Sequence, residues 1–270
     1  GKSGKAVKMN GGAVNTAAGF GVKLDSNLGS NYTVSVWVKP EKALPDNQQV
    51  IFVGYHAPQK WIGVTGYKAD DQTVKFWKND HSGFGTQKDG LKLPAGKWTL
   101  LTLSQAGNTA SVYANGQLFA TRDDMPDALN GDDQSIYLGV NYWDKTFGGL
   151  MDNACVYDTA LDAAQIAASY LKQAAPEDLV DAFGILNGNQ NINKLTEDLS
   201  LPAELGGIDI TWTSNAPTKL TNAGEVKVKD GSKVTLTAAA SVPELGFTWN
   251  ETFDVTLAKT VTIKHVDEKG

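Results

Sequence analysis

Aromatic residues stand beside amides, acids and histidines in three short stretches of the sequence, at residues 55–60, 77–84 and 141–147. Proteins bind sugars by stacking aromatic rings on the C–H faces of the sugar and by pairing its hydroxyls with amide or carboxylate groups. The three stretches therefore predict a site for a glycan. Its candidate residues are Tyr55, His56, Trp77, Asn79, Asp80, His81, Tyr142 and Trp143.

Tryptophan is also a frequent core residue, so these candidates have a structural alternative. Trp61 and Trp77 fit core packing and ligand stacking equally well. Trp143 is the one we expect to be exposed, because an asparagine, an aspartate and a lysine surround it. An exposed loop tryptophan can instead contact a neighbouring domain, so exposure alone does not define a sugar site.

Carboxylates that could form a hydrolytic centre are few in the first half of the chain. Retaining glycosidases place two carboxyl groups about 5 Å apart, and Glu41 is the only glutamate before Pro176. Adjacent aspartates occur at residues 70–71, 123–124 and 132–133, in turn-like sequence. Neighbouring residues on a strand would point to opposite faces. We therefore expect solvated loop acids and no catalytic residue in this chain.

Other catalytic and metal motifs are missing from the sequence. The histidines are His56, His81 and His265, and no Gly-x-Ser-x-Gly, His-Glu-x-x-His or phosphate-loop motif occurs. The single cysteine, Cys155, excludes an internal disulfide, and its apolar strand predicts a small buried side chain.

The bulk composition limits the partners. The net charge of −6 gives no electrostatic reason to expect nucleic acid or an anionic membrane. No segment approaches the roughly 20 consecutive apolar residues of a membrane helix, so we expect no membrane insertion. The chain opens abruptly at Gly1, and we interpret it as a piece of a longer protein.

Alternating apolar residues predict that β-strands carry the candidate residues. At residues 32–39, Tyr32 and Val34 begin one face, and Thr33 and Trp37 lie on the other. Further strands are expected at residues 50–53, 61–67, 73–77, 98–103, 110–113, 135–139 and 150–157. Many short strands with glycine-bearing turns predict a two-sheet antiparallel sandwich.

Two local signals refine this pattern. Asn115 and Gly116 stand between alternating apolar runs and predict a β-hairpin turn. Residues 162–172 form a helix-like run that Asp162 is placed to cap.

The composition changes near Pro176, which all eight tyrosines precede. After it, period-2 patterns without cysteine predict a second, small Ig-like β-sandwich with Trp212 and Trp249 in its core. Its expected strands lie at residues 199–202, 208–214, 224–228, 233–238 and 252–257.

Segments of the first half resemble one known family in the same order. They lie at residues 4–11, 32–40, 97–101, 112–116 and 149–166, and they resemble the laminin-G-like branch of the concanavalin A-like lectins. The second half resembles the atrophied bacterial Ig-like repeat through Leu-Pro at 201–202 and the runs at 210–215 and 224–226.

The two resemblances imply an all-β protein. Residues 1–175 would form a concanavalin A-like two-sheet sandwich, or jelly roll, with a short C-terminal helix. Residues 176–260 would form an Ig-like domain, and residues 261–270 a tail or a linker to a further domain. Trp37 and Trp98 occupy motif positions of the first family, which implies structural roles.

The resemblance also implies a function and a location. This domain pair is typical of extracellular bacterial carbohydrate-active enzymes and adhesins. It implies a non-catalytic, lectin-like carbohydrate-binding module with an Ig-like spacer, from a secreted or surface-attached glycoside hydrolase. The expected partners are a polysaccharide or glycan and a catalytic domain of the same chain. The alternative is a module that packs on a catalytic domain, or binds protein, without a free sugar site.

Calcium is the one cofactor that the resemblance suggests. Related domains often tie the first strand to the closing strand with a structural ion. The matching residues here are Asp152, Asn10 and Gly11. Many relatives carry aspartate at the position of Asn10, and Asp152 could instead accept hydrogen bonds from turn amides, so both interpretations stay open.

Overall fold

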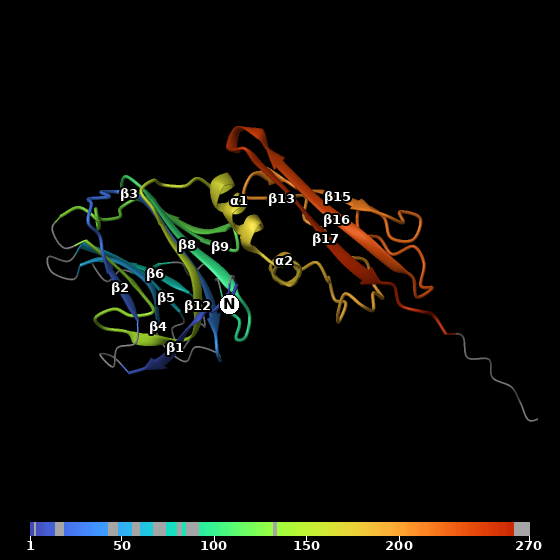
Figure 1. The fold of residues 1–270 in the computed structure, drawn as a ribbon, viewed down its shortest axis with the longest axis horizontal. Helices are drawn as coiled ribbons and strands as arrows, with labels where there is room; N and C mark the ends of the chain where they lie inside the picture. The colour runs from blue at the N-terminus through green and yellow to red at the C-terminus, as the bar shows by residue number, and fades with distance from the viewer. Residues whose placement is uncertain are drawn as a thin grey trace, which may run out of the picture. The chain divides into compact units, whose positions relative to one another are not determined.

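The computed structural model describes residues 1–2, 4–13, 19–42, 48–55, 60–66, 74–79, 83–84, 92–131 and 134–261. Contacts divide the chain into two compact units, Gly1–Gln173 and Ala174–Gly270 (Figure 1). The first is a β-sandwich with one helix, and the second carries smaller sheets. Among the described residues, no helix is both long and apolar enough to span a membrane.

The first unit consists of two antiparallel sheets around one apolar core, which confirms the predicted sandwich. In one sheet the order is β10 (Gln117–Arg122), β9 (Thr109–Ala114), β8 (Thr99–Ala106), β3 (Asn31–Pro40), β12 (Lys145–Tyr157) and β1 (Val7–Gly12). In the other it is β2 (Phe20–Lys23), β11 (Ser135–Leu138), β4 (Gln48–Tyr55), β5 (Lys60–Gly66), β6 (Lys75–Lys78) and β7 (Gly83–Phe84). The first two residues of β12 pair in parallel with β4 and join the sheets.

Strand β3 is buried on both faces, for two different reasons. Its alternate residues Tyr32, Val34, Val36 and Val38 enter the core, as the alternation predicted. The opposite face lies against the chain that follows β12: Thr33 Oγ1 donates to the Thr159 carbonyl at 2.9 Å.

Helix α1 (Ala163–Gln173) completes this cover over Trp37. The Trp37 ring lies 5.7 Å from the Tyr170 ring, centroid to centroid, and its indole N–H donates to Gln173 Oε1 at 2.9 Å. The helix begins where the sequence predicted, because the Asp162 carboxylate accepts the Gln165 amide at 2.8 Å. One outer face of the sandwich is therefore closed by the unit's own helix.

The predicted hairpin joins β9 to β10. Asn115 (φ 50°) and Gly116 (φ 79°) both adopt the left-handed conformation, which matches the twist of the flanking strands. Asn115 Oδ1 also accepts the Leu100 amide at 2.9 Å.

Cys155 differs from its prediction. It is half-buried, and the neighbouring Val156 is 43% exposed. The pairing of β12 with β3 shifts register between Asp152 and Cys155, so the last part of β12 leaves the regular core alternation.

The second unit contains helix α2 (Pro176–Phe183), the strand pair β13 (Glu204–Leu205) and β14 (Ile208–Asp209), and a three-stranded sheet. That sheet has the order β15 (Thr211–Ser214), β16 (Lys233–Val242) and β17 (Phe247–Thr256), with a 3-10 turn at Pro243–Leu245. Trp212 and Trp249 are buried, as predicted.

Two strands predicted for this unit do not form. Residues 199–202 contain no strand, and residues 224–228 contribute only an isolated bridge from Val226 to Leu220. Proline lacks a backbone donor, so Pro202 disfavours a ladder in the first of these segments. The small sheets fit an Ig-like domain, and the Ig-like family assignment stays a prediction.

Candidate functional site

The outer face of the second sheet carries a row of rings. Tyr137 of β11 lies opposite Phe52 of β4, Phe52 opposite Gly63 of β5, and Gly63 opposite Trp77 of β6. Directly opposite residues on neighbouring strands share a face, and the residues beside them on these strands belong to the core. The row therefore lies on the face turned away from the core.

Further rings pack onto Phe52 from β5 and from the loop after β11. The Phe52 ring lies 5.7 Å from Trp61, 5.7 Å from Tyr142 and 6.0 Å from Trp143. Trp61 and Trp143 lie 5.2 Å apart at 47°. These are favourable separations for stacked, tilted and edge-to-face aromatic pairs.

Asn141 fixes the loop that presents Trp143. Its Oδ1 accepts the backbone amides of Trp143 at 2.9 Å and Asp144 at 2.7 Å. Its Nδ2 donates to Gln49 Oε1 and to Asp144 Oδ2, both at 2.7 Å. Asparagine makes such local bonds readily in turns, so this loop is held to β4 while 40% of Trp143 stays exposed.

These elements enclose a pocket of about 190 Å³. Its described lining residues are Gln49, Trp61, Gly63, Trp77, Asn141, Trp143 and Asp144. Trp61 is only 4% exposed, and Trp77 is fixed by donating to Thr65 Oγ1 at 2.7 Å. At Gly63 a side chain would extend toward Gln49 and Trp61, so the missing side chain leaves room for a ligand.

Asp144 gives the pocket its charge. Burial raises the pKa of its carboxyl group, and the hydrogen bond from Asn141 opposes that rise. Aromatic walls, amides and one carboxylate are the chemical groups that bind a sugar, and this pocket combines them.

The structure brings together some of the predicted residues. Trp77 and Trp143 line the pocket. Tyr142 is not among the lining residues; its hydroxyl lies 3.1 Å from that of Tyr137 and its ring 6.1 Å from that of Tyr55. Asn79 follows β6 and is half-buried. His56, Asp80 and His81 lie outside the described residues.

Sequence reasoning missed four residues that line the pocket: Gln49, Gly63, Asn141 and Asp144. It also left Trp61 undecided between core and ligand, and in the structure Trp61 is buried against Phe52 and lines the pocket. Asn141 and Asp144 flank the predicted aromatics, so their position carried a usable signal. Gln49 and Gly63 carried none, because only strand pairing brings them to the pocket.

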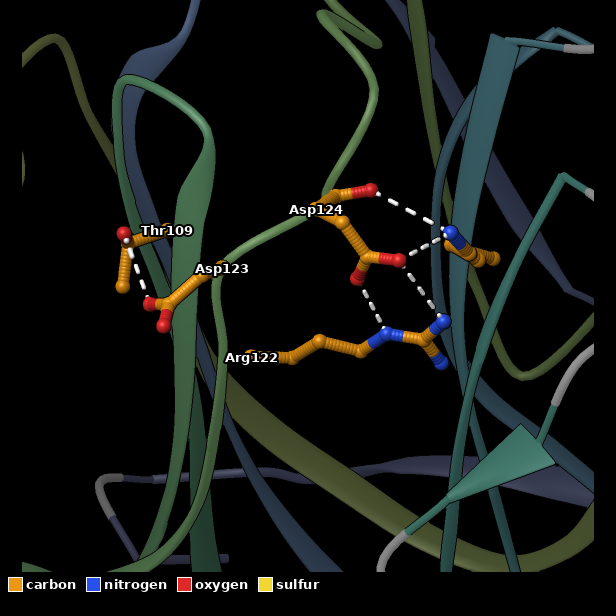
Figure 2. Close-up of polar contacts among 5 residues, drawn as sticks. Thr109, Arg122, Asp123 and Asp124 are labelled. Atoms are coloured by element: carbon orange, nitrogen blue, oxygen red, sulfur yellow. Dashed lines mark hydrogen bonds and ion pairs between the residues drawn. The ribbon is translucent and has the colours of Figure 1, made fainter.

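The carboxylates considered for hydrolysis have separate structural partners. Asp123 accepts from Thr109 Oγ1 at 3.1 Å, while Asp124 pairs with Lys78 at 2.5 Å and with Arg122 (Figure 2). Hydrogen bonds from Arg122 and Lys78 hold the pKa of Asp124 well below its usual range. Glu41 pairs with Lys8 at 3.5 Å. The aspartates at 70–71 and 132–133 lie outside the described residues.

The residues proposed for calcium do not come together. Asn10 lies opposite Gly148 of β12, with Gly11 beside it. Asp152 lies on the same strand, four residues beyond Gly148. The Asp152 carboxylate accepts the Lys2 amide at 2.5 Å and the Asn153 amide at 2.9 Å. No group of three or more His, Cys, Asp or Glu residues suited to a metal ion occurs in the described part of the chain. Asp152 and the pair Asn10 and Gly11 therefore lie at separate positions along β12, and calcium at this place stays a prediction.

Comparison with solved structures finds similar proteins. Domain 4 of AbnA, an extracellular GH43 arabinanase from Geobacillus stearothermophilus, in complex with arabinotriose, is 31% identical. The match covers 62% of this chain and 77% of that chain with a TM-score of 0.50. The CBM40 of the Ruminococcus gnavus IT-sialidase is 14% identical over 61% of this chain and 96% of that chain, with a TM-score of 0.42. A SAP-like pentraxin from Limulus polyphemus is 14% identical over 60% and 80%, with a TM-score of 0.45.

No curated protein matches this sequence. The family model of the concanavalin A-like lectin/glucanases superfamily, laminin-G type, matches residues 10–167, which is more than half of the chain. The chain therefore belongs to the concanavalin A-like lectin/glucanases superfamily.

Proposed function

We propose that the first unit is a non-catalytic carbohydrate-binding module whose ligand lies in the pocket between Trp61, Trp77 and Trp143. The observation that carries this proposal is one pocket lined by three tryptophans, two of them partly exposed, together with two amide side chains and a carboxylate. Such a pocket offers flat apolar surface and hydrogen-bonding groups together, which a saccharide requires.

The likeness to domain 4 of the arabinanase supports the same function. That domain was solved with arabinotriose and is 31% identical to this chain. A shared fold alone does not establish a ligand, so the proposal depends on the pocket and takes the relative as support.

We also propose the setting of this module. It would belong to a secreted or surface-attached bacterial glycoside hydrolase, in which it keeps a catalytic domain of the same chain near its polysaccharide. The second unit would act as a spacer. The extracellular source of the arabinanase domain supports this setting.

A second candidate function uses the same exposed ring. Trp143 is 40% exposed, and a ring of this kind can be covered by a catalytic domain or another protein. The module would then be a docking element without a free sugar site.

A glycan array tests the proposal. The 270-residue chain would be applied to neutral and acidic plant and host glycans, once in calcium and once in chelator. We expect binding of a defined glycan that Trp143→Ala and Trp77→Ala weaken by about tenfold or more. Trp98→Ala is the matched control. Trp98 is half-buried, lies near Lys39 and is outside the pocket.

Each outcome has a distinct meaning. A blank array with folded protein would move the assignment to the docking function. Binding that survives both pocket substitutions would place the sugar elsewhere. Loss of binding in chelator alone would support the calcium prediction, and unchanged binding would oppose a role for calcium at the site.

A further inference from the structure

The amide groups around the pocket already have partners within the protein. Gln49 Nε2 donates to the carbonyls of Ile51 and Val64, and its Oε1 accepts from Asn141. Asn141 uses both Nδ2 hydrogens, on Gln49 and Asp144. These amides shape the pocket and have no donor left for a ligand.

The Asp144 carboxylate, in contrast to these amides, keeps a hydrogen-bonding atom for a ligand. Its Oδ2 accepts from Asn141 at 2.7 Å, whereas its Oδ1 bonds to no group in the described structure. Asp144 is half-buried, and its backbone amide donates to Asn141 Oδ1. The pocket therefore presents a fixed acceptor, and a ligand that satisfies it must supply a donor such as a hydroxyl.

The same carboxylate makes the pocket unfavourable for anions. Lys, Arg and His are absent from its described lining residues. Lys75 and Lys145 are close in sequence to Trp77 and Asp144, but neither lines the pocket. Two like charges repel more strongly in a partly buried site than in water. An acidic sugar would therefore meet the negative charge of Asp144 with no cation among the described lining residues to offset it.

The size of the pocket limits what can enter it. Its volume of about 190 Å³ lies below the roughly 300–1,000 Å³ of pockets that hold drug-sized ligands. This space suits one sugar residue, and the rest of an oligosaccharide would lie outside it.

We propose that the pocket selects one uncharged sugar residue through hydroxyl donors to Asp144, and that this carboxylate excludes sugars bearing a carboxylate, such as uronic and sialic acids. This inference rests on the proposed carbohydrate-binding function. Asp144 is the specificity-determining residue, and Asn141 positions it.

Titration calorimetry on the full chain tests the inference. The ligands would be neutral arabino-, galacto- and gluco-oligosaccharides, and as acidic counterparts oligogalacturonate and sialyllactose. We expect the wild-type chain to bind at least one neutral ligand and to bind both acidic ones at least about tenfold more weakly. Asp144→Asn should weaken neutral binding by about tenfold, because hydrogen bonds to a charged acceptor are stronger than those to an amide.

Asp158→Asn is the matched control, since Asp158 is exposed in the same unit and does not line the pocket. It removes the same charge and should leave every affinity unchanged. Preferred binding of an acidic ligand, or unchanged neutral affinity in Asp144→Asn, would overturn the inference while the carbohydrate-binding function stands. Both proposals would be overturned if the wild-type chain bound none of these ligands and nothing on the array.

Discussion

The two outer faces of the sandwich use tryptophan in opposite ways. On the first sheet, Trp37 is 0% exposed, because α1 packs over it and Gln173 accepts its indole N–H. On the second sheet, Trp143 is 40% exposed beside a pocket. The comparison shows that an outward-facing tryptophan becomes structural where the chain supplies a cover, and stays available to a ligand where it does not.

Removing the covered ring should produce the largest effect. Trp37→Ala deletes a fully buried side chain and leaves a cavity, so we expect a loss of about 3–5 kcal/mol in the free energy of unfolding. Urea unfolding at neutral pH measures it. Trp143→Ala is the control and should cost much less, since part of that ring is already in water. Equal losses for the two variants would break the comparison.

Filling the pocket should remove binding while the fold is kept. A Cβ at Gly63 would lie 3.5 Å from Gln49 Oε1 and 3.7 Å from Trp61 Cζ3, which is ordinary contact. We expect Gly63→Ala to weaken glycan binding and Gly63→Val to weaken it by more than about tenfold, with unfolding free energy within about 1 kcal/mol of wild type. Calorimetry and urea unfolding would be run on the same samples. Unchanged affinity in Gly63→Val would show that the pocket is not the ligand site.

Asp144 should lower stability at neutral pH as a consequence of its place in the pocket. Burial raises the pKa of its carboxyl group, so the folded state holds the proton more tightly than the unfolded chain. The stabilising contribution is present below the unfolded pKa and is lost as pH rises through the folded pKa. Asp144→Asn should therefore gain stability relative to wild type between pH 4 and pH 7, although it loses binding. If Asp144→Asn instead lost stability relative to wild type as the pH rises, the sign of this prediction would be wrong.

Asp124 should show the reverse dependence, with the smallest effect. Its pKa is lowered by Arg122 and Lys78, so its contribution is present above the unfolded pKa and is lost as pH falls toward the folded value. Asp124→Asn should flatten the acid side of the stability profile, by a modest amount because the Asp124 carboxylate is exposed to solvent. Thermal unfolding from pH 7 to pH 3 measures it, and a profile identical to wild type would mean that the ion pair contributes nothing.

Local patterns made part of this fold predictable. The alternation at residues 32–39, the turn at Asn115 and Gly116, and the cap at Asp162 each depend on neighbours a few residues apart, and all appear as expected. The expected strands at 199–202 and 224–228 failed, because a period-2 pattern does not guarantee a partner strand.

The candidate site likewise has one part that local sequence predicts and another that it does not. The sequence by itself determined the sandwich and the aromatic loop that contains Tyr142 and Trp143. Only the tertiary structure decided that Gln49 and Gly63 face Asn141 and Asp144, because pairing between β4 and β5 and the return of the chain before β12 bring them together. Local composition records which residues can stack on or bond to a sugar. Which of them share a pocket depends on strand register, and register is set by contacts between residues far apart in the chain.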